Sequence, residues 1–170
     1  MLHGLKSATN VGMIVRTHVA FGGQEVVFVG SERPWEFRKQ SQVFSRKLEK
    51  LCELVFIETD EEFFSWCADR QLSTVALEIS SDSSPLRNFQ FPDRTALVVG
   101  NEGKGLTGEF MARCDHRILI PQYGQVGCLN VAVSCSIALY EISRSATNPQ
   151  PVHGSSFVVR DGTGAEPQHG

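Results

Sequence analysis

Short apolar runs rich in β-branched residues alternate with stretches in which apolar residues recur every three or four positions. The first pattern predicts buried strands, and the second predicts helices that bury one face. We predict strands over residues 25–29, 54–58, 74–79, 95–99 and 117–120. We predict helices over residues 11–21, from Thr59 onward, and over residues 129–144. This alternation indicates an α/β domain with a mostly parallel sheet flanked by helices, and any strand before Ser7 must be very short.

Local signals indicate where the predicted helices begin and end. Asn10 is placed to cap the first helix, and Gly22-Gly23 ends it. Acidic residues fill the first turn after Thr59, where the helix dipole favours negative charge. Small and apolar residues dominate the last helix, which we therefore expect to be buried on most sides.

Length and composition indicate one domain and a tail. A chain of 170 residues with 41% hydrophobic and 21% charged residues suits a single globular domain, which we assign to residues 1–145. Residues 146–170 are rich in glycine and proline and predict a flexible tail, in which Phe157-Val158-Val159 could dock on a surface. No membrane-spanning segment is expected, because no apolar stretch approaches about 18 residues. No signal peptide is expected either, because residues 1–20 lack a basic start followed by a continuous apolar core.

Cysteine and histidine positions give little support for disulfide or metal chemistry. The five cysteines contain no C-x-x-C pair, and an odd number cannot all be bridged within one chain. We therefore expect reduced thiols in the cytoplasm. The five histidines are dispersed, so no metal site is predicted.

The charge of −3 excludes a protein coated in positive charge, so a polyanionic partner would need a local patch. Residues 33–50 offer one, because Arg38, Lys39 and Arg46 alternate there with aromatic residues. Basic groups between aromatics suit phosphate contact and base stacking, so these three residues are candidates for RNA binding. The alternative is a solvated amphipathic helix whose aromatic residues pack inward.

Residues 97–110, LVVGNEGKGLTGEF, predict a buried strand that leads into glycines and then a helix. Gly103, Gly105 and Gly108 form the spacing G-x-G-x-x-G of dinucleotide-binding loops. That site also needs an acidic residue about 20 positions later, and no carboxylate occurs between Asp115 and Glu141. A nucleotide-dependent oxidoreductase would depend on this stretch alone, so the loop needs another explanation.

Three separated stretches provide that explanation. They read N-x-G-x-x-x-R-T from Asn10, V-V-G-N-E-G-x-G-L from Val98, and I-P followed by G-C-L-N-V-A-V from Ile120. In order and separation they resemble the motifs of the SpoU, or TrmH-like, branch of the SPOUT RNA methyltransferases, over roughly residues 5–144. The resemblance implies an α/β domain with a C-terminal deep trefoil knot, S-adenosylmethionine as methyl donor, and a homodimer that methylates RNA. Compact members often act on tRNA, so we expect ribose 2′-O methylation of tRNA before ribosomal RNA.

The resemblance also implies a donor pocket lined by Leu77, Gly100, Ile120 and Leu129. Glycines at such a wall let backbone groups meet adenine and ribose directly. Leu77, Ile120 and Leu129 would also suit an ordinary core. Gly100 stands at a strand exit and is harder to explain by packing.

Arg16 matches the family's catalytic arginine. Because a guanidinium is normally protonated, we expect it to hold the substrate phosphate and stabilise developing negative charge rather than act as a base. An ordinary exposed arginine on a capped helix is the alternative. Asn10 and Asn130 match motif asparagines that position hydroxyls or backbone groups. Glu102 is expected to pair with an arginine, either Arg16 or Arg144, the latter from this chain or from a partner subunit.

Cys128 departs from the family pattern, in which serine commonly precedes the Leu-Asn of the third motif. A thiol is a weaker hydrogen-bond donor than a hydroxyl, so a contact to donor or RNA could be weaker here. Direct nucleophilic catalysis by Cys128 is disfavoured, because oxygen methylation needs no covalent enzyme intermediate. An RNA-binding module that has lost catalysis therefore stands as the main alternative to an active enzyme.

Overall fold

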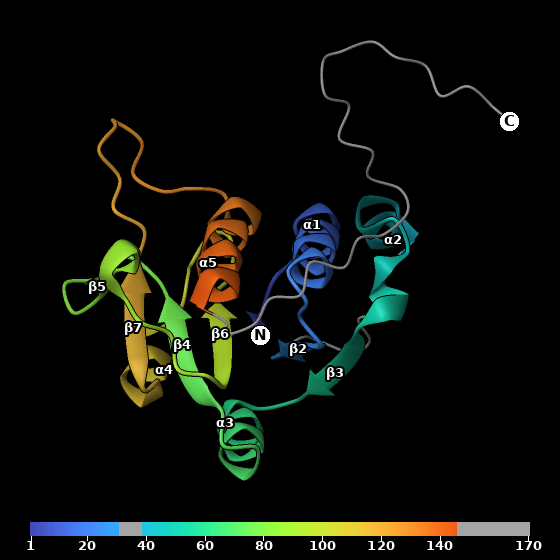
Figure 1. The fold of residues 1–170 in the computed structure, drawn as a ribbon, viewed down its shortest axis with the longest axis horizontal. Helices are drawn as coiled ribbons and strands as arrows, with labels where there is room; N and C mark the ends of the chain where they lie inside the picture. The colour runs from blue at the N-terminus through green and yellow to red at the C-terminus, as the bar shows by residue number, and fades with distance from the viewer. Residues whose placement is uncertain (31–38, 146–170) are drawn as a thin grey trace, which may run out of the picture.

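The computed structural model describes residues 1–30 and 39–145 and contains one seven-stranded sheet (Figure 1). Arg38 and the predicted tail, residues 146–170, lie outside the described residues. The strands pair in parallel in the order β3-β2-β1-β6-β4-β7-β5. Their bounds are β1 Leu2–His3, β2 Glu25–Val29, β3 Glu53–Ile57, β4 Ser73–Leu77, β5 Ser84–Pro85, β6 Thr95–Val99 and β7 His116–Leu119. The mostly parallel α/β sheet predicted from the sequence is confirmed.

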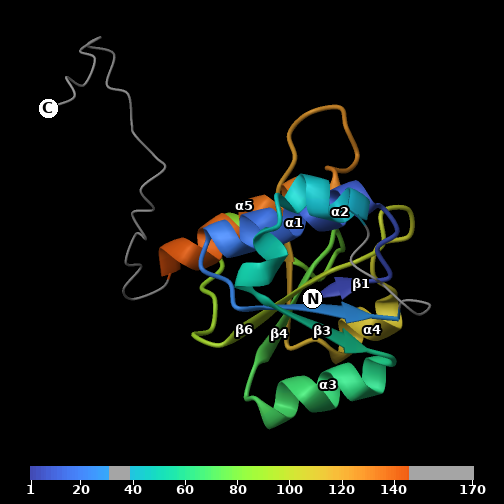
Figure 2. The ribbon, with the colours of Figure 1, turned by 90° about the vertical axis from the view of Figure 1, so that its right-hand side faces the viewer.

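Helices cover both faces of this sheet. Figure 2 shows α1, α2 and α5 on one face, with α3 and α4 on the other. The bounds are α1 Ala8–Ala20, α2 Lys39–Ser45, α3 Asp60–Asp69, α4 Gly108–Arg113 and α5 Val131–Ser145, with short 3₁₀ helices η1 Leu48–Leu51 and η2 Leu86–Asn88. Within the described ranges no helix is long and apolar enough to cross a membrane.

Alternation along the central strands produces two separate cores. On β2, Val26 and Phe28 join the core under α1 and α5, whereas Val27 and Val29 join the core over α3 and α4. Successive strand residues point to opposite faces, so a continuous apolar run is expected when both faces are covered. The sheet is therefore buried at its centre, and chemistry has to take place at the ends of the strands.

The predicted strands agree closely with the structure. The strands predicted over residues 25–29 and 95–99 are confirmed with the same bounds, and the other three begin one residue earlier than predicted. The helix that begins after Thr59 is also confirmed, and Thr59 and Glu62 form a capping box at its start.

The predicted N-cap of the first helix is wrong. α1 begins at Ala8, and its N-cap is Ser7, whose hydroxyl accepts a hydrogen bond from the Asn10 N–H at 3.3 Å. Both residue types suit this position. The side chain of Asn10 is instead used in longer-range contacts, described below. The last helix likewise begins at Val131, so Leu129 and Asn130 precede it.

Candidate functional site

A short chain of hydrogen bonds joins the three sequence motifs. Asn10, on the first turn of α1, is only 8% exposed. Its Nδ2 donates to Glu102 Oε1 at 3.1 Å, and its Oδ1 accepts from Asn130 Nδ2 at 3.1 Å. These contacts span 92 and 120 positions of sequence. A buried amide needs partners for both its ends, and each partner here comes from a different motif.

Glu102 holds the start of α1 and pairs with neither Arg16 nor Arg144 of its own chain, while a pair with Arg144 of a partner subunit stays a prediction. Its carboxylate accepts from the backbone N–H groups of Lys6 at 3.1 Å and Ser7 at 2.9 Å. Unpaired N–H groups and the helix dipole make such a position favourable for a carboxylate. Burial raises the pKa of Glu102, but the hydrogen bonds from Ser7, Lys6 and Asn10 outweigh it, and the net shift is downward. The candidate partner Arg144 instead pairs with Glu141 at 2.9 Å.

Asn130 links the network to the start of α5. Its Oδ1 accepts from the backbone N–H groups of Ala132 at 2.9 Å and Val133 at 3.4 Å. These are among the first N–H groups of the helix, which have no partner within it. The same side chain therefore caps α5 and binds Asn10, and this fixes the position of the segment just before it, which contains Cys128 and Leu129.

The glycine-rich loop after β6 is a compact turn closed by its own side chains. Asn101 Oδ1 accepts from the N–H groups of Gly103 at 2.9 Å and Lys104 at 3.2 Å, while Asn101 Nδ2 donates to Gly4 O at 2.7 Å. A Cβ added at Gly100 would lie 2.3 Å from the carbonyl carbon of Gly105. Packing therefore explains Gly100 fully, contrary to the expectation from the sequence.

A small cavity of about 80 Å³ lies at the carboxyl ends of β4 and β7. Leu77, Ile120 and Leu129, three of the four predicted donor-binding residues, line it together with Cys128, whereas Gly100 does not. Ligands of open α/β sheets bind at this end of the strands. The volume is well below the roughly 300–1,000 Å³ of typical ligand pockets.

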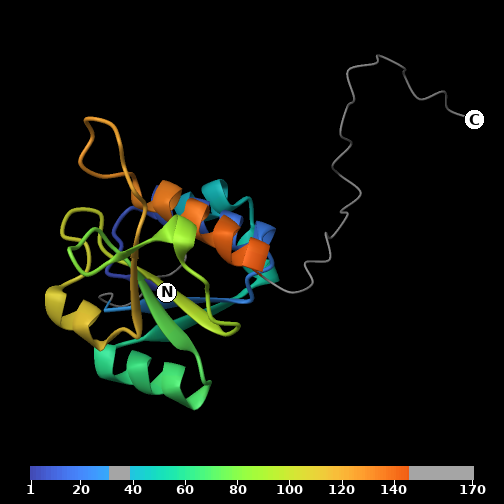
Figure 3. The ribbon, with the colours of Figure 1, turned by 60° about the vertical axis from the view of Figure 1, so that its left-hand side comes forward.

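One side of this cavity is formed by a loop that could enlarge it. Residues 123–130 are all exposed, and the loop between β7 and α5 projects beyond the sheet (Figure 3). Few buried contacts are typical of segments that open at low free-energy cost. A ligand larger than the cavity would therefore be accommodated by outward movement of this loop.

Glu78 is a residue of this site that sequence reasoning missed. It follows the last residue of β4, lines the small cavity, and accepts from the backbone N–H groups of Ile79 and Leu106, both at 3.0 Å. An acidic residue directly after the buried strand T-V-A-L was the signal that could have identified it.

Arg16 and α2 form a neighbouring exposed surface. Arg16 is exposed, and no described residue forms an ion pair with it. A Cβ added at Gly12 would lie 2.4 Å from Ser41 O, so glycine allows α2 to pack closely on α1. The predicted RNA-binding residues Lys39 and Arg46 are exposed near the two ends of α2.

The alternative of inward-packed aromatic residues concerns one residue of α2, Phe44, because the other aromatic residues of this stretch lie outside the described residues. The buried residues of α2 are Ser41 and Ser45, both 0% exposed, while Phe44 is 37% and Val43 71% exposed. Small side chains are needed on this face, because α2 lies directly against Gly12. The consequence is an outer surface that combines apolar and basic groups.

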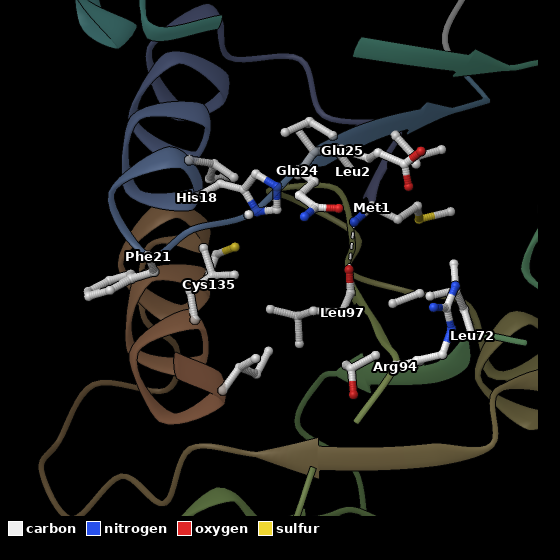
Figure 4. A pocket seen from close by; sticks show the side chains of 18 of the residues that line it. Met1, Leu2, His18, Phe21, Gln24, Glu25, Leu72, Arg94, Leu97 and Cys135 are labelled. Carbon is white, nitrogen blue, oxygen red and sulfur yellow. Dashed lines mark hydrogen bonds between the residues drawn. The ribbon is translucent and has the colours of Figure 1, made fainter. Parts of the chain in front are cut away.

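A larger cavity, of about 430 Å³, lies at the opposite end of the sheet (Figure 4). His18, Leu97 and Cys135 line it, and the amino group of Met1 donates to Leu97 O at 2.6 Å. Burial lowers the pKa of His18 to about 4, so its ring is neutral at pH 7. None of the predicted site residues lines this cavity. Position at the carboxyl ends of the strands, and not size, therefore identifies the candidate site.

The cysteines and possible metal ligands can be placed in the same structure. All five cysteines are free, and Cys128 is exposed. Burial raises the pKa of Cys67, Cys114 and Cys135 to about 11, so these thiols stay protonated. Among the side chains that the structure describes, no group of three or more His, Cys, Asp or Glu residues could hold a metal ion.

Known proteins share this combination of fold and motifs. The SpoU rRNA Methylase family matches residues 1–140. A 23S rRNA (adenosine(1067)-2′-O)-methyltransferase of Streptomyces azureus is 31% identical over 147 residues, which cover 83% of this chain and 52% of that protein. This chain thus spans about half the length of that relative.

Solved structures have the same fold. The TrmH/SpoU tRNA-modifying enzyme of Aquifex aeolicus has a TM-score of 0.75 and 28% identity, covering 85% of this chain and 72% of that one. An AdoMet-bound rRNA methyltransferase of Sinorhizobium meliloti has a TM-score of 0.74 and 25% identity, covering 84% of this chain and 54% of that one. The deep trefoil knot implied by the sequence resemblance stays a prediction.

Proposed function

Because the chain belongs to the SpoU rRNA Methylase family, we propose that it transfers a methyl group from S-adenosylmethionine to a ribose 2′-hydroxyl of RNA. The observation that carries the proposal is the hydrogen-bonded chain from Glu102 through Asn10 to Asn130. It joins three motifs that are far apart in sequence, and it ends beside Leu129 at the small cavity.

We place the methyl donor at the carboxyl ends of β4 and β7. Leu77, Ile120 and Leu129 offer apolar contact there, and Glu78 offers a carboxylate. Pockets of this kind combine apolar walls with a few polar groups that orient the ligand. The donor supplies an electrophilic methyl group on a positively charged sulfur. The protein's tasks are then to align the 2′-hydroxyl and to help remove its proton.

Arg16 is proposed to act on the RNA side of the reaction. Its exposed guanidinium is free to take a substrate phosphate in a bidentate contact and to stabilise negative charge as the 2′-oxygen loses its proton. Asn10 and Asn130 would orient the segment that carries Cys128 and Leu129. The thiol of Cys128 would make a weaker contact than the serine of related motifs and so lower the rate without changing the reaction.

We propose tRNA as the substrate and the basic surface of α2 as part of the binding face. Exposed Lys39 and Arg46 suit phosphate contacts, and exposed Phe44 suits stacking on a base. A tRNA-modifying enzyme, at 28% identity, is among the solved structures with this fold, which supports the choice of tRNA, and ribosomal RNA is the alternative. The reaction would take place in the cytoplasm, which cell fractionation would test.

Titration calorimetry with S-adenosylmethionine, followed by methylation of unmodified tRNA, tests the proposal. We expect saturable donor binding, and a 2′-O-methylnucleoside detected by mass spectrometry of the digested RNA. Hydrogen exchange in residues 121–130 should slow when donor binds, because the exposed loop, once displaced outward by a ligand larger than the present cavity, gains contacts with that ligand. Methylation of a ribosomal RNA fragment but not of tRNA would contradict the choice of substrate. RNA binding with no detectable donor binding would instead support the inactive RNA-binding module.

A homodimer is proposed from the apolar face of α1 and α5. Met13 and Phe21 on and after α1 are 41% and 39% exposed, and Val133 and Tyr140 on α5 are 43% and 51% exposed. Contiguous exposed apolar groups of this kind mark interaction surfaces. Sedimentation equilibrium should give twice the monomer mass, and Tyr140→Asp should shift the protein toward monomer. A wild-type protein that sediments as a monomer at 100 μM, about the level expected to saturate a stable dimer, would contradict the proposal.

A further inference from the structure

Glu78 connects two segments of the candidate donor site. Its Oε1 accepts from the N–H of Ile79 at the end of β4, and its Oε2 accepts from the N–H of Leu106 after the glycine-rich turn. Gly105, at φ +64°, leaves room for this carboxylate, because a Cβ there would lie 2.3 Å from Glu78 Oε2. The turn therefore has its shape partly because an ionisable group is packed against it.

The carboxylate of Glu78 has no cationic partner among the residues that the structure describes. No lysine, arginine or histidine there forms an ion pair with it. A carboxylate has about four lone-pair sites, and the two backbone N–H groups use two of them. Its neighbours in the cavity include Leu77, Ile120 and Leu129, and apolar walls of this kind strengthen the field of an uncompensated charge.

We propose that Glu78 provides the negative charge that makes this site prefer S-adenosylmethionine to its product, S-adenosylhomocysteine. The inference rests on the proposed function. The two molecules differ at the reacting atom, where the donor has a positively charged sulfonium and the product has a neutral thioether. Hydrogen bonds to the ribose or to the amino acid part would raise the affinity of S-adenosylmethionine and of S-adenosylhomocysteine equally. Attraction between opposite charges raises the affinity of S-adenosylmethionine alone. Loss of the methyl group would then weaken binding and promote product release.

The size of the preference follows from Coulomb attraction. Two unit charges roughly 6–10 Å apart at an effective dielectric constant of about 20 give a preference of roughly 10- to 100-fold in affinity. Glu78→Gln keeps the length of the side chain but removes the charge and one of the two acceptor oxygens, so its loss of loop support should weaken both ligands equally, while its loss of charge weakens the donor alone. Glu78→Asp keeps the charge but shortens the reach to Leu106, so the two variants separate charge from loop support.

The test is calorimetric titration of each protein with S-adenosylmethionine and, separately, with S-adenosylhomocysteine. For Glu78→Gln we expect the Kd of the donor to rise by about 10-fold or more relative to any rise in the Kd of the product. Glu78→Asp should weaken both ligands yet keep most of the preference. Asp82→Asn is the matched control, because Asp82 is an exposed carboxylate four positions along the same connection and does not line the cavity. It should leave both Kd values unchanged.

Equal weakening of both ligands in Glu78→Gln would overturn the inference and leave Glu78 as a support for the loop. Unchanged affinities would also overturn it, because the sulfur would then lie too far from the carboxylate to be affected by its charge. Thermal unfolding of each variant shows whether the protein is folded. If Glu78→Gln does not fold, Glu78→Asp tests the inference: a retained preference for the donor over the product supports it, and a lost preference overturns it. A wild-type protein that binds neither ligand would mean that the proposed function itself had failed.

Discussion

Replacement of Arg16 by alanine is expected to lower kcat for RNA methylation by roughly 100- to 1,000-fold, the usual cost of removing one donor that stabilises developing charge. The Kd for S-adenosylmethionine should stay within about twofold of wild type, because Arg16 does not line the cavity. Arg16→Lys should recover only part of the rate, since an ammonium cannot make the planar bidentate contact with phosphate. Single-turnover methylation and calorimetry measure the two quantities separately.

Two controls distinguish this effect from general loss of positive charge. The double variant Lys39→Gln, Arg46→Gln should raise the KM for RNA and reduce its salt dependence while kcat is largely kept, because these residues are proposed to contact phosphate away from the reacting sugar. Arg87→Ala, at an exposed arginine on η2, should change neither constant. An Arg16→Ala protein that methylates at the wild-type rate would contradict the proposed role.

The main elements of the fold could be predicted because each is long enough to show a recognisable pattern of apolar residues. β2 and β6 are five-residue strands with four consecutive apolar residues each, they lie between two helical layers, and their bounds were predicted correctly. β1 and β5 have two residues each, which is too short to show any periodicity. A helix at α2 was expected only as the alternative for residues 33–50, and its bounds could not be predicted because its buried face consists of Ser41 and Ser45 and has no apolar stripe.

The candidate site could be predicted in part, by motif spacing. Leu77, Ile120 and Leu129 do meet at one cavity, and Asn10, Glu102 and Asn130 do meet in one network. The other two partners of Glu102 could not be predicted, because they are the backbone N–H groups of Lys6 and Ser7 and so are set by the path of the chain. Nearly every residue type has a backbone N–H group, so the residue type does not show which N–H group will be the hydrogen-bond partner.

Gly100 is a second residue whose contacts could not be predicted from the sequence. The sequence marks it as a glycine that needs an explanation, but the residues that surround it, Gly105 and Leu106, are close only because the turn folds back on itself. The bridge between Asn101 and Gly105 fixes this return. Its role is therefore to close the turn, while the cavity is lined by neighbouring segments.

Gly100→Ala is accordingly expected to destabilise the protein by about 3 kcal/mol, the upper end of the usual cost of overpacking. The added methyl group would lie 2.3 Å from the carbonyl carbon of Gly105 and 2.5 Å from Leu106 N, and backbone atoms cannot yield as a flexible side chain can. Displacing Leu106 would also break its hydrogen bond to Glu78, so donor affinity should fall by more than about 10-fold. Urea unfolding and calorimetry measure the two effects.

Gly103→Ala is the matched control within the same turn. A Cβ there would meet only Asn101 Oδ1, at 3.6 Å, which is ordinary van der Waals contact. Gly103 does not have a positive φ, so alanine should cost less than about 0.5 kcal/mol and could stabilise the turn by restricting the unfolded chain. If both variants unfold at the same urea concentration as wild type, the turn does not pack against Gly100 as described. Equal destabilisation by both would mean that any side chain disturbs the loop, and the specific contact with Gly105 would not be the cause.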